Sequence, residues 1–78
     1  MGTEIMVLFF GKAEVAAGRR EETFTAEDTA ALRRQLLDKY PAMAGIPFRM
    51  ALNKTILKEE SALNKNDIIA ILPPFQGG

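Results

Sequence analysis

The sequence predicts a single small α+β domain, in which a mixed sheet of about five strands carries one main helix on one face. Two observations support this class. Apolar stretches rich in β-branched and aromatic residues lie near both ends of the chain, at residues 4–10 and 67–72. Between them, only residues 29–39 combine apolar residues at helical spacing with a preceding N-cap residue. One long helix among several short strands is typical of an α+β roll.

The N-terminal half contains the elements that the helix and the sheet edge require. We expect a strand, a short turn or helical piece, a polar edge strand and the main helix at residues 4–10, 12–18, 20–25 and 29–39. Asp28 is placed to cap the helix, and Leu32 and Leu36 fall on its apolar stripe. Pro41 ends the helix, because the residue before a proline disfavours helical backbone angles.

The C-terminal half is expected to complete the sheet. We predict a loop, two short strands, a polar connection, a second turn and a last strand at residues 42–47, 48–52, 55–57, 58–62, 64–67 and 67–72. Asn53-Lys54 is a plausible tight turn, since Asn tolerates positive φ, and Leu63 is expected to tuck under the sheet. The first and last strands are the most hydrophobic, so we place them side by side at the centre.

The chain after the last strand differs in character from the rest. Pro73 and Pro74 stop the strand, because proline has no N–H for a sheet and resists helix. Two glycines follow, and glycine adopts backbone angles that are closed to other residues. We therefore expect a domain over residues 1–72 and an extended arm over residues 73–78, which ends on the carboxylate of Gly78.

The residue types present restrict the chemistry. The chain has no Cys and no His, which excludes disulfides, thiolate nucleophiles, Cys/His metal sites and Ser-His-Asp arrangements. Ten basic and ten acidic residues balance, so nothing electrostatic favours nucleic acid or an anionic membrane as a partner. We expect a cytoplasmic protein, since we find neither a membrane-length apolar run nor a signal peptide. The carboxylates expected to be surface and capping groups are Glu21, Glu22, Glu27, Asp28, Glu59 and Glu60.

Strand alternation divides the apolar residues of the two central strands between two faces. The set expected under the helix is Ile5, Val7, Phe9, Ile69 and Ile71. The set expected on the opposite face is Met6, Leu8, Phe10, Ile68 and Leu72. No second long helix is available to cover that face, and an exposed apolar patch of this kind marks an interface. We expect a partner protein there that also receives the arm, with a second copy of the chain as the alternative.

Three stretches resemble the family of molybdopterin synthase small subunits. They are Val-Leu-Phe-Phe-Gly at residues 7–11, Ala-Leu-Asn-Lys-Thr at residues 51–55, and residues 66–78, which end in Pro-Pro-Phe-Gln-Gly-Gly. This family consists of ubiquitin-like β-grasp sulfur carriers, related to the sulfur carrier of thiazole synthesis, and the resemblance spans nearly the whole chain. The chain departs from many relatives at Asn66, where they have Gly, and at Phe75-Gln76, where they often have smaller residues.

The resemblance implies a carrier that is not an enzyme by itself and has no intrinsic cofactor. An activating adenylyltransferase, similar to that of ubiquitin, uses ATP to adenylate Gly78, and sulfur transfer then gives a thiocarboxylate. In the large synthase subunit this sulfur passes to cyclic pyranopterin monophosphate, within a heterotetramer of two carriers and two large subunits. Gly77 and Gly78 form the implied reactive site. The partner contacts that we expect on the uncovered sheet face and along the arm are Met6, Leu8, Phe10, Leu72, Pro74, Phe75 and Gln76.

Three other functions stay open at this point. The chain could carry sulfur for thiamine thiazole or another thiolated product, although thiazole carriers usually lack the two prolines before the glycines. It could instead be a protein modifier whose terminus is joined to lysines of target proteins. It could also be a plain ubiquitin-like interaction domain in which the two glycines are inert.

Overall fold

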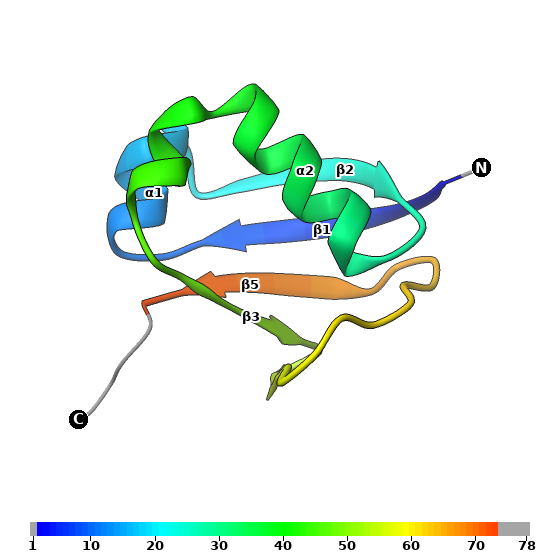
Figure 1. Cartoon of the computed structure of the whole chain (residues 1–78). Coiled ribbons are helices and arrows are strands. Elements are labelled where there is room, and N and C mark those ends of the chain that lie inside the picture. Colours follow the sequence, from blue (N-terminus) through cyan, green and yellow to red (C-terminus); the bar gives the residue numbers. More distant parts are fainter. Residues whose placement is uncertain (1, 74–78) are drawn as a thin grey trace.

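The chain folds as a mixed sheet of five strands with one long helix across it, in a computed structural model that describes residues 2–73 (Figure 1). The strands are β1 (Thr3–Phe9), β2 (Glu21–Ala26), β3 (Arg49–Leu52), β4 (Thr55–Ile56) and β5 (Ile68–Leu72). The helices are α1 (Lys12–Ala17), α2 (Thr29–Lys39) and the 3₁₀ helix η1 (Pro41–Gly45). The predicted α+β class is therefore confirmed.

The first and last strands meet at the centre of the sheet, as predicted. The strand order is β2-β1-β5-β3-β4, with β1 parallel to β5 and the other neighbours antiparallel. Met6 pairs with Ile68 and Phe9 with Ile71, which places the apolar residues of both strands in step across the sheet. The polar strand β2 lies at the edge, where Phe24 is its largest buried residue.

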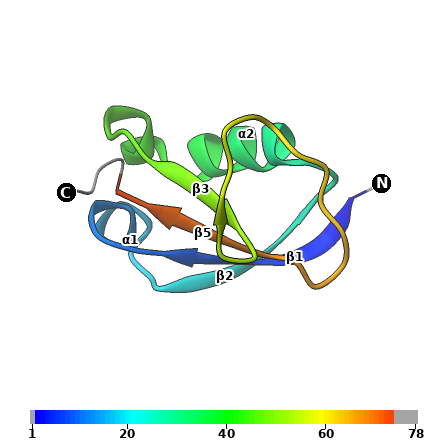
Figure 2. The same cartoon turned by 90° about the horizontal axis from the view of Figure 1, so that it is seen from below.

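The core lies between the sheet and α2. Helix α2 begins behind Asp28, whose side-chain Oδ1 accepts a hydrogen bond of 2.8 Å from the N–H of Ala31. Leu32 and Leu36 of α2 are completely buried. The strand residues beneath them, 0 to 2% exposed, are those predicted: Ile5, Val7, Phe9, Ile69 and Ile71. Figure 2 shows α2 on this side of the sheet.

Two tight turns hold the strands in register. Asn53 (φ 47°) and Lys54 (φ 77°) have positive φ at the β3–β4 turn, the conformation that favours Asn at such positions. The side chain of Asn53 also reaches β5, because its Oδ1 accepts a hydrogen bond of 2.9 Å from the N–H of Ile68. Asn66 (φ 72°) makes the second turn directly before β5. The predicted turns at both places are confirmed.

The structure corrects the expectation of a plain loop after α2. Residues 41–45 form η1, with Pro41 in its first turn and Met43 completely buried. Proline suits this position, because its missing N–H would have no helical partner there. The first strand also ends one residue earlier than predicted. Phe10 lies beyond β1, although its N–H still donates to the carbonyl of Ile71 at 3.1 Å.

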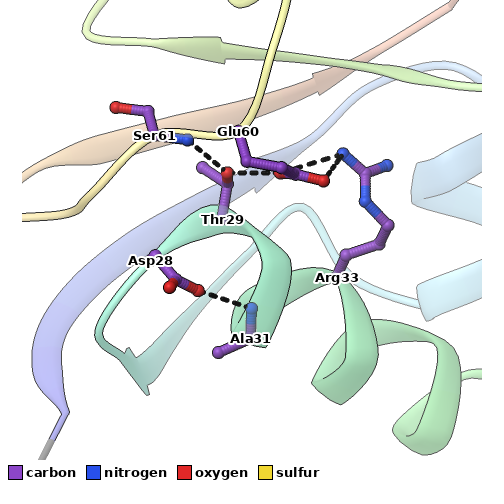
Figure 3. Close-up of polar contacts among 6 residues, drawn as sticks. All are labelled: Asp28, Thr29, Ala31, Arg33, Glu60 and Ser61. Atoms are coloured by element: carbon purple, nitrogen blue, oxygen red, sulfur yellow. Dashed lines mark hydrogen bonds and ion pairs between the residues drawn. The ribbon is translucent and has the colours of Figure 1, made fainter.

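A polar clamp fastens the long connection between β4 and β5 to the start of α2 (Figure 3). The fully buried Thr29 donates its hydroxyl hydrogen bond to Glu60, and its Oγ1 accepts one of 2.9 Å from the N–H of Ser61. Arg33 of α2 forms an ion pair with Glu60 at 3.3 Å. The hydrogen bond from Thr29 lowers the pKa of Glu60, and the hydrogen bond from Arg33 lowers it further by a smaller amount. Glu60 is therefore a tether for this connection, a role that its expected assignment as a surface group omits.

Candidate functional site: an uncovered apolar sheet face beside the arm

The sheet face opposite α2 exposes large apolar side chains. Phe10 and Ile68 are each 44% exposed and Ile56 is 48% exposed, whereas Met6, Leu8 and Leu72 are half-buried. Within residues 2–73 no helix lies against this side of the sheet (Figure 2). We call this surface the outer face, and its residues are Met6, Leu8, Phe10, Ile56, Ile68 and Leu72.

A shallow groove runs along the outer face over four strands. Its floor is formed by small residues, since Ala51 of β3 and Ala70 of β5 are paired across the sheet. Its walls are the larger apolar residues around them, together with the β3–β4 turn. The lining residues are Leu8, Phe10, Ala51, Asn53, Lys54, Ile56, Ile68, Ala70 and Leu72. A small-residue floor between large walls is a shape that receives apolar side chains from a partner.

A second apolar pocket, of about 330 Å³, lies where the chain leaves the sheet. It is lined by Phe10, Gly11, Lys12, Ala13, Pro47, Phe48, Leu72 and Pro73. Phe10 and Leu72 line both this pocket and the groove, so one apolar surface continues from the outer face to the start of the arm. The charged residues that line these two hollows are Lys12 and Lys54, and both are basic.

The structure brings together the predicted partner contacts that it describes. Met6, Leu8 and Leu72 lie on the outer face, and Phe10 lies at the end where β5 gives way to Pro73. The remaining predicted site residues lie outside the described residues, so their roles stay predictions: Pro74, Phe75, Gln76, Gly77 and Gly78. Ile56 was missing from the predicted contacts. The predicted two-residue turn at Asn53-Lys54 could have indicated it, because that turn pairs Ile56 with Ala51.

One carboxylate with a lowered pKa, Glu22, is structural and pairs with the end of α2. The Glu22 side chain is only 9% exposed, and it accepts hydrogen bonds from Lys39 and Tyr40. Burial by itself raises the pKa of Glu22, but the hydrogen bonds and the positive charges of Lys39 and Arg19 outweigh burial and lower it. Glu22 is therefore only partly exposed, and its expected role as a surface group omits this pairing. Its burial depends on residues that α2 brings over β2.

Residues 2–73 contain no cluster of three or more His, Cys, Asp or Glu side chains placed to hold a metal ion. No helix in the same range has the length and apolarity needed to cross a membrane.

The parallel pairing of the first and last strands, with α2 crossing the sheet, defines a ubiquitin-like β-grasp protein. The small archaeal modifier protein 1 of Methanosarcina acetivorans has this fold, with a TM-score of 0.87, 26% identity, and coverage of 100% of this chain and 99% of that chain. The chain belongs to the ThiS family, whose model matches residues 7–78.

Two other similar proteins have molybdopterin in their names. A molybdopterin synthase sulfur carrier subunit of Caenorhabditis briggsae is 42% identical, over 95% of this chain and 96% of its own length. A complex of subunits 1 and 2 of the molybdopterin-converting factor of Helicobacter pylori contains a chain that is 28% identical. That chain aligns with a TM-score of 0.74, over 97% of this chain and all of its own length.

Proposed function

We propose that this chain is the sulfur-carrying small subunit of a molybdopterin synthase, with the C-terminal carboxylate of Gly78 as the carrying group. The observation that carries the proposal is the 42% identity, over nearly the full length of both chains, to a molybdopterin synthase sulfur carrier subunit. The outer face supports it, since it offers a continuous apolar surface directly beside the start of the arm.

The proposed chemistry uses the terminus in two stages. The carboxylate oxygen of Gly78 attacks the α-phosphorus of ATP in an adenylyltransferase, which forms an acyl adenylate and releases pyrophosphate. Hydrosulfide then attacks the carbonyl carbon, forms a C–S bond and expels AMP, which leaves a thiocarboxylate after loss of a proton. Donation of that sulfur to cyclic pyranopterin monophosphate, with water supplying the replacing oxygen, returns the carboxylate. No cysteine is needed on the carrier, which agrees with its absence from the chain.

The outer face defines the chemistry of the proposed partners. A complementary surface is apolar at its centre, to fill the groove, and acidic at its rim, to meet Lys12 and Lys54. The proposed partners are the activating adenylyltransferase and the large synthase subunit, the latter in a tetramer of two carriers and two large subunits. Both partners require the same single arm, so they must bind the carrier in turn. Docking on the face makes the reaction at Gly78 effectively intramolecular.

Two other functions have a specific observation in their favour. The ThiS family match leaves sulfur delivery to a thiazole as an alternative. The structural likeness to a small archaeal modifier protein supports attachment of the terminus to lysines of target proteins. Both alternatives start from the same adenylated terminus, so they differ from the main proposal in the acceptor.

Intact-mass measurement after incubation with the adenylyltransferase, ATP and a sulfur donor tests the shared chemistry. We expect a mass gain equal to one oxygen-to-sulfur exchange, and none in a variant that lacks Gly78 but keeps its fold and partner binding. Adding the large subunit and cyclic pyranopterin monophosphate should then return the carrier to its original mass. A carrier that never exchanges oxygen for sulfur, under conditions that load a known carrier, would contradict the proposal. Lysine conjugates in place of sulfur delivery would favour the modifier function.

A further inference from the structure

Gly11 lies against the first residue of the arm. The parallel pairing of β1 with β5 ends at Phe9 and Ile71, but Phe10 extends it by donating its N–H to the Ile71 carbonyl at 3.1 Å. The next residues on both sides, Gly11 and Pro73, therefore still run beside each other. A Cβ atom built on Gly11 would lie 3.3 Å from Cγ of Pro73 and 4.0 Å from its Cδ.

The backbone of Gly11 also requires glycine. Its φ of 57° and ψ of −132° match the first central position of a type II′ turn, which side-chain-bearing L-residues rarely occupy. This turn directs the chain from β1 into α1 while its backbone stays against the ring of Pro73. A side chain at Gly11 would thus both strain the turn and push against the ring.

Pro73 has little freedom to absorb such a push. Its own ring fixes its φ, and as the residue after Leu72 it restricts Leu72 to extended angles. Pro74 restricts Pro73 in the same way, on sequence alone. The direction in which the chain leaves β5 is therefore set by a stiff Leu72-Pro73 segment that rests on Gly11.

We propose that Gly11 is a positioning residue that aims the arm, so that a partner docked on the outer face receives the terminus in the correct direction. This inference rests on the proposed function, because the direction of the arm affects a reaction only if the terminus reacts. A reacting terminus misplaced by about 1 Å can lose about a hundredfold in rate. The contact itself is a property of the free domain. It acts through the arm and does not touch the reacting atoms.

Gly18 offers a matched control on the other side of α1. It also has positive φ (74°), so Gly18→Ala strains the backbone in a related way, but a Cβ there meets nothing within 4 Å. Pro73→Ala offers a second control, because it removes the Cγ atom that the added Cβ would meet. In the double variant Gly11→Ala/Pro73→Ala the strain at residue 11 persists while the contact is lost. A double-mutant cycle therefore isolates the contact from the strain.

The first experiment measures the arm direction without any partner. Since the chain has no cysteine, Val15→Cys, at an 83% exposed position of α1, carries a single nitroxide label. We expect Gly11→Ala to change the paramagnetic relaxation of the amides of residues 75–78, and Gly18→Ala to leave it unchanged. An unchanged pattern in Gly11→Ala, or the same change in both variants, would overturn the inference whatever the protein's function.

The second experiment measures sulfur transfer in a single turnover with saturating large subunit, at temperatures where every variant is folded. We expect Gly11→Ala to slow transfer about tenfold or more while its Kd for the large subunit stays within about threefold. In the Pro73→Ala background the same change should cost about twofold or less. Equal losses in both backgrounds would overturn the inference. A wild-type protein that takes up no sulfur would instead refute the proposed function and leave the label experiment to decide on Gly11.

Discussion

The two faces of the sheet are built from the same strands and from equally apolar residues, yet they have opposite surroundings. Ile69 and Ile71 point under α2 and are completely buried, whereas their neighbour Ile68 on the same strand is 44% exposed. The difference is the helix, which covers one face only. Burial of apolar area stabilises a fold at about 25 cal/mol per Å², so an uncovered apolar face leaves stabilisation unused in the free domain. The outer face is thus suited to binding, and the inner face to folding.

The edges of the two faces differ as well. At each end of α2 a polar cluster closes the inner face, with Glu22 bound by Lys39 at one end and Thr29 bound to Glu60 at the other. The groove and pocket of the outer face have single basic residues at their margins, Lys12 and Lys54. The polar clusters of the inner face are paired within the chain and hold α2 in place. The apolar groove and pocket of the outer face are instead suited to side chains of another protein.

The largest effect is expected from Ile71→Ala, on the inner face. The change leaves a cavity beneath α2, and losses of about 2 to 5 kcal/mol in the free energy of unfolding are typical of such truncations. Urea denaturation measures it. The matched control is Leu72→Ala, one residue along β5 on the outer face, which should cost less than half as much. Equal losses at the two positions would show that both faces are core.

Phe10→Glu tests the outer face and should act on binding instead of folding. A buried charge opposite an apolar, acid-rimmed partner surface should weaken the complex with the large subunit by about 2 kcal/mol, or roughly thirtyfold in Kd. Isothermal titration calorimetry gives this Kd, and thermal melting should show little change. Val15→Glu, which places the same charge at an exposed position of α1, should leave the Kd unchanged. A large loss of stability in Phe10→Glu would assign Phe10 to the core.

The smallest effect is expected at the margin of the inner face, from Glu22→Gln. Since the pKa of Glu22 is lowered in the folded state, its ionised form adds stability above the ordinary carboxyl range, and this is lost as pH falls through the lowered pKa. The variant should be less stable than the wild type by about 1 kcal/mol at neutral pH. The difference in stability between the variant and the wild type should disappear at acidic pH. Urea midpoints measured at a series of pH values show it, and a gap independent of pH would exclude this linkage. Glu21→Gln, on the exposed side of β2, is the control.

Local patterns were enough to predict most of the fold. Asp28 and Pro41 bound α2 at the predicted residues, and strand alternation alone separates the buried Ile69 from the exposed Ile68. The 3₁₀ helix η1 escaped prediction because a five-residue element has no periodicity to detect, and a proline near its start looks like a helix stop. A helix of two or three turns has a periodicity that can be read from sequence, whereas a single helical turn depends on the residues that pack over it.

Features that depend on distant residues were the ones that sequence reasoning missed. Glu22 is partly buried because Lys39 and Tyr40 at the end of α2 pack against it, and Glu60 is a tether because it accepts a hydrogen bond from Thr29. The contact between Gly11 and Pro73 follows from the register of β1 against β5, which the composition of neither strand reveals. The outer face could be predicted because it needs alternation alone. The contact of Gly11 with Pro73 could not be predicted, because it depends on how β1 pairs with β5.

The strand in the middle of the sheet, β5, is also the last strand before the arm, so the fold depends on the segment that leads into the arm. A protease that clips the chain within β5 removes the pairing on both sides at once, and it separates the β1–β2 hairpin from the β3–β4 hairpin. Two-stranded hairpins are at best marginally stable alone, so such a chain unfolds and is open to complete degradation. A cut within β5 therefore does not leave a folded domain that occupies partners without an arm to offer them.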